Sequence, residues 1–412
     1  MDLPEDLLQI TRVNTIRMAE RTRIVLKSGK DQSLRRFHPW VFSGAIKKIH
    51  GPEREGSLVD VYDNKEEFLA TGHYQKGSIA VRLLSFDQVE TDQSFWDDKI
   101  ANAWKLRKKL GLVESPDTQV FRWVNAEGDG LPGLIVDYYA GTAVVQMHSI
   151  GMHHQLEAIV NALKKSAGDR LHTIYNKSES TLPDKPGISE KSGFLLGKKD
   201  TGEAQENGFR FLVNWKSGQK TGFFIDQREN RKLVGEYSRD RKVLNMFGYT
   251  GGFSIYAMGG GAKLVHSVDS SGKAIDLTRK NAELNFPGDE RHKAFAVDAF
   301  SYFNEMEESY DLMILDPPAF AKHQNVLNNA LQGYKRLNQR AFEHIAPGGI
   351  VFTFSCSQAV SRDNFRRSVF VAAANARRKV RILHQLSQPP DHPVSIYHPE
   401  GEYLKGLVLE VE

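Results

Sequence analysis

Cysteine is nearly absent from this chain of 412 residues, which contains a single one, Cys356. One thiol cannot form a disulfide within the chain, and no cysteine and histidine cluster has zinc-site spacing, so we expect no metal. The sequence also lacks the run of about 20 apolar residues that a membrane-spanning helix needs. Residues 1–18 have no uninterrupted apolar stretch and include acidic side chains, unlike a secretory signal. We therefore expect a soluble, cytoplasmic protein without a membrane or metal partner.

Charge is close to balanced, with 55 Lys and Arg against 51 Asp and Glu and a formal net charge of +4. Residues 1–50 contain ten Lys or Arg and five Asp or Glu, whereas residues 51–100 contain five and eleven. A mildly basic protein favours an anionic partner such as a nucleic acid. A solvated charged surface explains the distribution almost as well, so charge alone does not identify the partner.

The pattern of apolar residues divides the chain into an extension, residues 1–19, and three predicted domains. Residues 20–95 alternate apolar and polar side chains over short runs, which is typical of a small barrel or curled sheet. Strands and helices alternate in residues 201–412, which predicts an α/β fold with a parallel sheet. Residues 96–200 mix both kinds of element: helices are expected at 95–109 and 153–165, strands at 121–124, 134–138 and 142–148, and a loop at 177–190.

The predicted strands of residues 201–412 are apolar runs that lead into turns. Ligands of such sheets bind outside the carboxyl ends of the strands, so the residues just after these ends are candidate site residues. Helices are expected at 227–238, 252–258, 272–284, 326–344 and 362–374, and a hairpin of 379–385 with 403–411 closes the chain. The strands are expected to end at Asn245, Asp269, Val297, Asp316 and Phe354.

A glycine-rich turn, NMFGYTGG at residues 245–252, follows the first of these strands. Glycine lets a ligand approach the backbone closely, and the next helix presents its N-terminus there. The spacing matches neither the dinucleotide signature GxGxxG nor the phosphate-binding signature GxxxxGK[ST], which disfavours a pyrophosphate ligand. Because a lone turn of this kind is as often only a tight turn, it needs further support.

Two acidic residues supply that support. Asp269 ends the next strand, where it can accept both hydroxyls of a ribose, and Asp298 follows the third strand, where it can meet an adenine amino group. Each acid alone is better explained as a solvated loop residue or a helix cap. In this order, at successive strand ends, they describe a pocket for S-adenosylmethionine. The predicted cofactor-binding residues are Asn245, Phe247, Gly248, Tyr249, Thr250, Gly251, Asp269, Ser270, Asp298, Ala299, Asp316, Pro317, Phe224, Asp226 and Arg228.

The single thiol lies in Phe354–Ser357 (FSCS), one predicted strand after the motif Asp316-Pro317-Pro318. A strand ending in DPP places a carboxylate and a rigid turn where a planar base can dock, and the thiol can reach the same base. Carbon 5 of a pyrimidine becomes nucleophilic only after something adds to C6, so this pair suits methylation at C5. A lone cysteine is more often a small buried hydrophobic residue, and that alternative stays open.

Several longer runs resemble the bacterial rRNA large-subunit methyltransferase I family, and the likeness extends from about residue 20 to near the end of the chain. The most specific run is GQKTGFFIDQRENR at residues 218–231. The resemblance implies a PUA domain at 20–95, a small α+β middle domain at 96–200 and a class I, Rossmann-like methyltransferase domain at 201–412. The other runs that carry it are His38–Gly44, Glu127–Leu134, Asp316–Phe320, Phe354–Ser357 and Glu400–Gly406.

The resemblance implies S-adenosylmethionine-dependent formation of 5-methylcytosine in large-subunit (23S) rRNA, with RNA as the partner, and it admits a homodimer. Cys356, as a thiolate, would attack C6 of a cytosine turned out of the RNA stack, and Asp316 would hydrogen-bond N3 and N4. The sulfonium of the cofactor and cations such as Lys220 and Arg228 would lower the pKa of the thiol. The predicted RNA-contacting residues are Pro318, Phe320, Lys220, Lys27, Arg35, Arg36 and Lys47.

Three alternatives stay open. Ala319 stands where many RNA cytosine-5 methyltransferases carry a second cysteine, which is thought to serve enzyme release. The sequence therefore leaves the base that removes the C5 proton unidentified, with Asp226 and an ordered water as the two candidates. An enzyme that methylates a purine nitrogen would also use DPP and an aromatic residue, with Cys356 purely structural. A non-catalytic RNA-binding or ribosome-assembly factor could keep a methyltransferase-like fold, although the glycine-rich turn, Asp269 and Asp298 argue against it.

Overall fold

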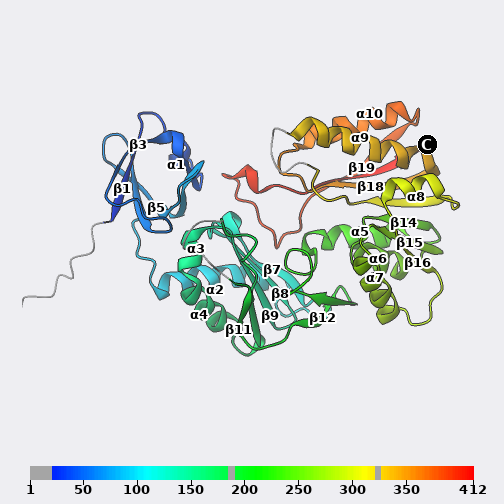
Figure 1. Ribbon diagram of the computed structural model, residues 1–412, viewed down its shortest axis with the longest axis horizontal. Helices are drawn as coiled ribbons and strands as arrows, with labels where there is room; N and C mark the ends of the chain where they lie inside the picture. Colours follow the sequence, from blue (N-terminus) through cyan, green and yellow to red (C-terminus); the bar gives the residue numbers. More distant parts are fainter. Residues whose placement is uncertain (1–20, 184–190, 321–325) are drawn as a thin grey trace, which may run out of the picture. The chain divides into compact units, whose positions relative to one another are not determined.

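The computed structural model of the chain describes residues 21–183, 191–320 and 326–412 (Figure 1). The expected extension of residues 1–19 lies outside these ranges. The described chain divides into two units, one formed by the residues before Trp96 together with Ser149–Ala158, the other by Trp96–His148 and Ile159–Glu412. The predicted middle and C-terminal domains therefore fall largely within one unit. Among the described helices, none has both the length and the apolar character that crossing a membrane requires.

The first unit is built on a six-stranded sheet in the order β2-β6-β5-β4-β1-β3, which agrees with the expected small curled sheet. Alternate residues of its strands, such as Ile24 and Leu26 or Val59 and Val61, are fully buried and form one core. A short helix, α1 (Gln32–Arg35), follows the first strand. The strands are β1 (Thr22–Leu26), β2 (Trp40–Phe42), β3 (Ile46–His50), β4 (Leu58–Tyr62), β5 (Phe68–Tyr74) and β6 (Ile79–Ser85).

A five-stranded sheet in the order β11-β10-β9-β8-β7 occupies the middle of the chain. The prediction found three of its strands but missed β10 and β11, which are only four residues long. The described part of the predicted loop, residues 177–183, contains no strand or helix, and residues 184–190 lie outside the described ranges. The strands are β7 (Val120–Asn125), β8 (Leu134–Tyr139), β9 (Thr142–Met147), β10 (Thr173–Asn176) and β11 (Gly193–Leu196), and the helices are α2 (Gln93–Lys109), α3 (Ile150–His154) and α4 (Leu156–Ala167).

The C-terminal part forms a seven-stranded sheet in the order β16-β15-β14-β17-β18-β20-β19. Its first five strands are parallel, and β20 runs antiparallel to both β18 and β19. Each of the five predicted strand ends is confirmed to within one residue. The strands are β14 (Lys242–Met246), β15 (Leu264–Asp269), β16 (His292–Ala296), β17 (Tyr310–Leu315), β18 (Ile345–Ser355), β19 (Val380–Leu386) and β20 (Lys405–Val411).

Helices cover both faces of this sheet because its parallel strands are apolar on both sides. Val243 and Val265 belong to the core that includes α6, whereas Leu244 and Met246 belong to the core that includes α9 (Figure 1). The prediction missed the seven-residue helix α8 and the two-stranded sheet of β12 (Thr201–Glu206) and β13 (Phe209–Asn214). The helices are α5 (Arg228–Tyr237), α6 (Gly252–Gly259), α7 (Gly272–Asn285), α8 (Ala299–Glu305), α9 (Leu327–His344) and α10 (Arg362–Asn375).

Candidate active site

Residues that follow β14, β15, β17 and β18 line a cavity of about 420 Å³, which is within the size range of small-molecule sites. The cavity lies where an open α/β sheet is expected to bind its ligand. Most of the residues predicted for the site line it: Lys220, Phe224, Asp226, Phe247, Gly248, Tyr249, Thr250, Asp269, Ser270, Asp298, Asp316, Pro317, Pro318 and Cys356.

The glycine-rich turn after β14 has an unusual backbone. Phe247 and Tyr249 have φ angles of 59° and 44°, in the left-handed region that non-glycine residues rarely adopt, and Gly251 has φ 83° where it precedes α6. The turn is fixed by hydrogen bonds to α7 and β15: Thr278 Oγ1 donates to Tyr249 O at 2.8 Å, and the amide of Gly248 donates to Val268 O at 3.0 Å. A Cβ atom at Gly251 would lie 2.8 Å from Thr278 Cγ2, so glycine is also required for packing. Such strain is typical of a ligand-binding turn.

Asp269 is fixed at the end of β15 by two backbone amides. Its Oδ2 accepts from the amide of Tyr249 at 3.0 Å and its Oδ1 accepts from the amide of Ser271 at 2.8 Å. A carboxylate oxygen has two lone pairs, so both oxygens can still accept a hydrogen bond from a ligand. The carboxylate thus ties the glycine-rich turn to β15 and lines the cavity at the same time.

Asp298 serves as the N-cap of α8. Its Oδ1 accepts from the amides of Phe300 at 2.9 Å and Ser301 at 3.2 Å. The helix-cap explanation is therefore correct, but it does not exclude the other one, because Asp298 also lines the cavity. Together the strained turn, Asp269 and Asp298 supply a close backbone approach and two carboxylates, which fit a nucleoside that carries ribose hydroxyls and an amino group. Within the described ranges, no group of three metal-ligating side chains is placed to bind a metal ion.

Cys356 follows β18 and faces the turn that follows β17. Its side chain is partly buried, and its Sγ lies 3.9 Å from Pro317 O. The residues on either side of Cys356 are fixed by hydrogen bonds, since Ser355 Oγ and Ser357 Oγ lie 2.9 Å and 3.0 Å from the hydroxyl of Tyr334. Burial and the nearby carboxyl of Asp316 raise the pKa of the Cys356 thiol to about 11, against a smaller opposing effect of Lys220. The thiol is therefore protonated at neutral pH, and of the two cations expected to lower its pKa, Lys220 acts in that direction.

Asp316 is held by a chain of amide hydrogen bonds. Asn230 Nδ2 donates to Gln227 Oε1 at 2.6 Å, which orients the Gln227 amide so that its NH₂ group bonds the Asp316 carboxyl. Burial, and then the charge of Asp226, raise the pKa of Asp316 to about 7, although the Gln227 bond acts in the opposite direction. A carboxyl of this kind can be present in its protonated form near neutral pH and can then donate a hydrogen bond.

Asp226 is another carboxyl of the cavity, and its pKa is shifted in the opposite direction from that of Asp316. It lies in the 3₁₀ turn Ile225–Gln227 before α5, and the Tyr403 hydroxyl donates to its Oδ2 at 2.7 Å. Burial alone would raise its pKa, but Lys220 and the Tyr403 hydrogen bond are among the influences that outweigh burial and lower it. Asp226 is therefore ionised where Asp316 retains a proton, although both line one cavity.

Apart from the four predicted cations of the first unit, five of the predicted site residues do not line the cavity. Arg228 is buried, and its guanidinium donates to both oxygens of Asp391 at 2.8 Å and 3.0 Å, so its charge is already neutralised. The ring of Phe320, predicted to contact RNA, instead packs in the core with its centre 4.7 Å from that of the Tyr334 ring. The other three lie just behind the lining residues, namely Asn245, Gly251 and Ala299.

The predicted RNA-contacting cations of the first unit differ in their surroundings. The guanidinium of Arg35 forms ion pairs with Asp31, Asp63 and Glu67 at 2.7, 2.8 and 3.1 Å. The ammonium of Lys27 donates to Gly44 O at 2.9 Å. The other two predicted cations, Arg36 and Lys47, have exposed side chains. Lys48, which follows Lys47 in the sequence, is exposed as well.

Sequence reasoning missed several residues of the cavity. Gln227 lies in the run 218–231 that carried the resemblance, and Leu404 lies in the run 400–406, which also contains Tyr403, the hydrogen-bond donor to the lining residue Asp226. Position in such a run was therefore the available signal for all three. What the sequence could not supply is the contact of Tyr403 with Asp226, which joins residues 177 positions apart.

Two sequence profiles match the chain. Residues 130–405 match a family described as S-adenosylmethionine-dependent methyltransferases, and residues 24–86 match a PUA-like domain. Among curated proteins, the chain is 40% identical to ribosomal RNA large subunit methyltransferase I of Alteromonas mediterranea, over 94% of this chain and 98% of that protein. It is also 40% identical to the protein of that name from Aeromonas salmonicida and 36% identical to that from Klebsiella pneumoniae, with the same two shares covered.

Solved structures share the fold. A chain described as a SAM-dependent methyltransferase from Streptococcus mutans superposes with a TM-score of 0.82 at 22% identity, covering 94% of this chain and all of that one. A second solved chain, described as a methyltransferase complexed with SAH, gives the same values. At this identity the likeness concerns the fold: it extends over the PUA-like part, the middle sheet and the seven-stranded sheet.

Proposed function

The chain belongs to the ribosomal RNA large subunit methyltransferase I family of S-adenosylmethionine-dependent methyltransferases, and from this premise we propose that it forms 5-methylcytosine through a Cys356–C6 adduct. Family membership makes it an S-adenosylmethionine-dependent methyltransferase of large-subunit rRNA. The base and the covalent mechanism are our inference. Because bacterial rRNA is made and modified in the cytoplasm, we place the protein there as part of the same proposal.

One observation carries the proposal: the only thiol of the chain lines the same cavity as the DPP carboxyl and the nucleoside-binding turn. S-adenosylmethionine supplies an electrophilic methyl group there. Cys356, after losing its proton, attacks C6 of the cytosine, and the electron pair of the C5–C6 bond becomes available at C5. A pyrimidine must leave the RNA stack to reach a partly buried thiol, so the proposal includes base flipping.

Asp316 fits the role of the acid in this attack. Addition at C6 places negative charge on the ring, and a proton given to N3 neutralises it. Because burial and Asp226 raise the pKa of Asp316 to about 7, its protonated form is available at neutral pH. The Gln227 amide holds the carboxyl in place. Pro317 and Pro318 stiffen the turn against which the base lies.

A second function has one observation in its favour. Burial and Asp316 raise the pKa of the Cys356 thiol to about 11, which is what a purely structural cysteine would show. In that case the DPP motif would serve an enzyme that methylates a purine nitrogen, whose lone pair needs no nucleophilic catalyst. Lys220, which lowers the thiol pKa and lines the cavity, argues for the cytosine mechanism.

The test is methyl transfer from labelled S-adenosylmethionine to deproteinised large-subunit rRNA, followed by digestion to nucleosides. We expect label in 5-methylcytidine with the wild-type protein and none with Cys356→Ala or Cys356→Ser. Calorimetric binding of S-adenosylmethionine to the variants is the control for folding. Label in a purine nucleoside, or activity that survives both substitutions, would exclude the proposal and favour the structural cysteine. The homodimer stays a prediction, which light scattering tests.

A further inference from the structure

The proposed reaction leaves one proton without an acceptor. Methylation of the adduct gives a C5 atom that carries both the new methyl group and its original hydrogen. Release of the product requires loss of that hydrogen as a proton, so that the electron pair rebuilds the C5–C6 double bond and expels the thiolate. Cys356 is the leaving group in this step and cannot also be the base, and Asp316 serves N3. A further group of the cavity has to accept the proton.

Asp226 has the position of such a group. It is 7% exposed and lines the same cavity as Cys356 and Asp316. It lies close enough to both for its charge to raise the pKa of each. The Tyr403 hydroxyl donates to its Oδ2 at 2.7 Å, which fixes the plane of the carboxylate and leaves Oδ1 to accept a proton.

The two carboxyls are suited to opposite tasks. The pKa of Asp226 is lowered and that of Asp316 is raised to about 7, although burial acts upward on both. When two titratable groups of one site are held in different protonation states, the protonated one can act as the acid and the ionised one as the base. Lys220 and the Tyr403 hydroxyl stabilise the charge of Asp226 and lower its pKa. Burial and the charge of Asp226 raise the pKa of Asp316.

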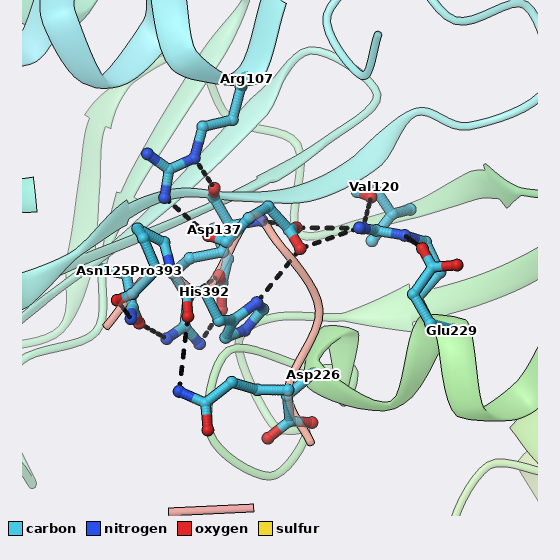
Figure 2. Close-up of polar contacts among 12 residues, drawn as sticks. Arg107, Val120, Asn125, Asp137, Asp226, Glu229, His392 and Pro393 are labelled. Carbon is cyan, nitrogen blue, oxygen red and sulfur yellow. Dashed lines mark hydrogen bonds and ion pairs between the residues drawn. The ribbon is translucent and has the colours of Figure 1, made fainter. Parts of the chain in front are cut away.

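The segment between β19 and β20 holds Tyr403 in place. Gln388 Oε1 accepts from the amides of Tyr403 and Leu404 at 3.3 Å and 3.4 Å. Further back, both oxygens of Asp391 accept from Arg228, and Asp391 Oδ2 also accepts from the amide of Arg122 at 2.9 Å. Figure 2 shows this segment, which carries His392 and Pro393, passing between the labelled Arg107 and Asp226. The segment is therefore anchored to the protein interior at Asp391 and His392, which are buried, whereas residues such as Ile396 and Tyr397 are exposed.

We propose that Asp226 is the catalytic base that takes the C5 proton of the methylated adduct, and that Tyr403 is the residue that positions it. The proposal rests on the proposed cytosine mechanism. In this step the C5–H bond breaks and the proton passes to Asp226, its electron pair forms the C5–C6 double bond, and the C6–S bond breaks to return the thiolate. The proton that Asp316 gave to N3 returns in the same step, so the product is a neutral 5-methylcytosine.

Asp226→Asn tests this assignment because it keeps the shape of the side chain and removes the basic oxygen. Burial, the larger cause of the raised pKa of Asp316, is unchanged in this variant, so at pH 6 Asp316 still supplies its proton and we expect the variant to attack and methylate the cytosine but not to release it. An adduct that resists SDS and carries one labelled methyl group per protein should therefore accumulate, while turnover falls about 100-fold or more. Wild-type protein on RNA that contains 5-fluorocytosine supplies the reference adduct, since fluorine cannot leave C5 as a cation. Asp276→Asn, at an exposed position of α7, is the matched control and should turn over normally.

The outcomes separate the two proposals. If the wild-type protein makes 5-methylcytosine and Asp226→Asn turns over normally, or forms no methylated adduct although it is folded, the assignment of the base is wrong and the cytosine mechanism stands. If the wild-type protein makes no 5-methylcytosine, both proposals fail.

Tyr403→Phe keeps the carboxylate and tests the assignment again if Asp226→Asn does not fold. It should accumulate the same adduct with turnover reduced on the order of tenfold, the effect of one hydrogen bond to a charged group. Normal turnover in Tyr403→Phe would contradict the positioning role.

Discussion

At the scale of single residues, the protonation state of Cys356 decides when the site can react. The thiolate is the nucleophile, and in the ligand-free protein burial and Asp316 keep the thiol protonated. Lys220, whose ammonium lies 4.9 Å from the ring centre of Phe224, is the neighbouring cation that acts in the opposite direction.

This balance of charges predicts how fast the single thiol is alkylated at different pH. Because the pKa of Cys356 is about 11, the thiolate fraction and the rate with iodoacetamide should rise about tenfold per pH unit between pH 7 and 10. Asp316→Asn removes a charge that raises this pKa and should accelerate alkylation about threefold to tenfold at pH 9. Lys220→Met removes a cation that lowers it and should slow the reaction.

The pH range of the Asp316 effect supplies a check within the same experiment. The carboxyl has a pKa of about 7, so it is mostly protonated and without effect on the thiol below that pH, and it is ionised above it. The rates of wild-type protein and Asp316→Asn should therefore converge towards pH 6 and separate above pH 7. Mass spectrometry reports the modification directly, since the chain has no other cysteine. Equal rates across the range would show that the two groups do not interact.

At the scale of elements, the segment from Ser387 to Leu404 links the closing strands to the cavity through one buried ion pair. Asp391 is fully buried, and Arg228 is 2% exposed. Removing one partner of such a pair leaves an uncompensated buried charge. The same segment carries Leu404, which lines the cavity, and Tyr403, which donates to the lining residue Asp226, so its position affects chemistry as well as stability.

We expect Asp391→Asn to lower the free energy of unfolding by about 3–5 kcal/mol, measured by urea denaturation at pH 7. Glu402→Gln is the matched control, because Glu402 forms an exposed ion pair with Arg362, and this substitution should lower the free energy of unfolding by at most about 1 kcal/mol.

Burial raises the pKa of Asp391, but His392 and Arg228 outweigh burial and lower it overall. Its stabilisation is therefore present at neutral pH and is lost as the pH falls. The difference between wild type and Asp391→Asn should shrink below about pH 4, where the unfolded carboxyl takes up its proton. A loss no larger than that of the control would contradict the anchoring role.

The elements also separate what the sequence could reveal from what it could not. The ends of the five parallel strands were predicted to within one residue because each strand is an apolar run that leads directly into a turn. The sheet of β12 and β13 was missed because β12, TGEAQE, lacks a run of apolar residues and has one buried hydrophobic residue, Ala204. Arg228 was assigned to the cofactor because nothing in the sequence places Asp391 beside it. Local pattern therefore fixes strands and their ends, whereas ion pairs between distant segments require the folded chain.

At the scale of the whole molecule, we expect the PUA-like unit to bind RNA and the methyltransferase unit to carry out the chemistry. The cavity and every residue of the proposed mechanism belong to the second unit. The exposed cations that the sequence predicted for RNA belong to the first, and phosphate contacts from such side chains hold RNA in position without reading its sequence. Substitutions in the first unit should therefore change affinity for rRNA and leave the chemical step intact.

The first unit offers a matched comparison of this kind. Lys47 and Lys48 are exposed on β3, whereas Arg35 already forms ion pairs with three carboxylates. Lys47→Ala with Lys48→Ala should weaken rRNA binding and lower the slope of log affinity against log salt by about 1 for each phosphate that the protein no longer neutralises. Arg35→Ala should change that slope much less, because its charge is neutralised within the unit. Fluorescence anisotropy at several salt concentrations measures both, and S-adenosylmethionine binding should be unchanged in all variants. If Arg35→Ala had the larger effect, RNA would have to displace its three carboxylate partners, and the binding face would lie around α1 rather than on β3.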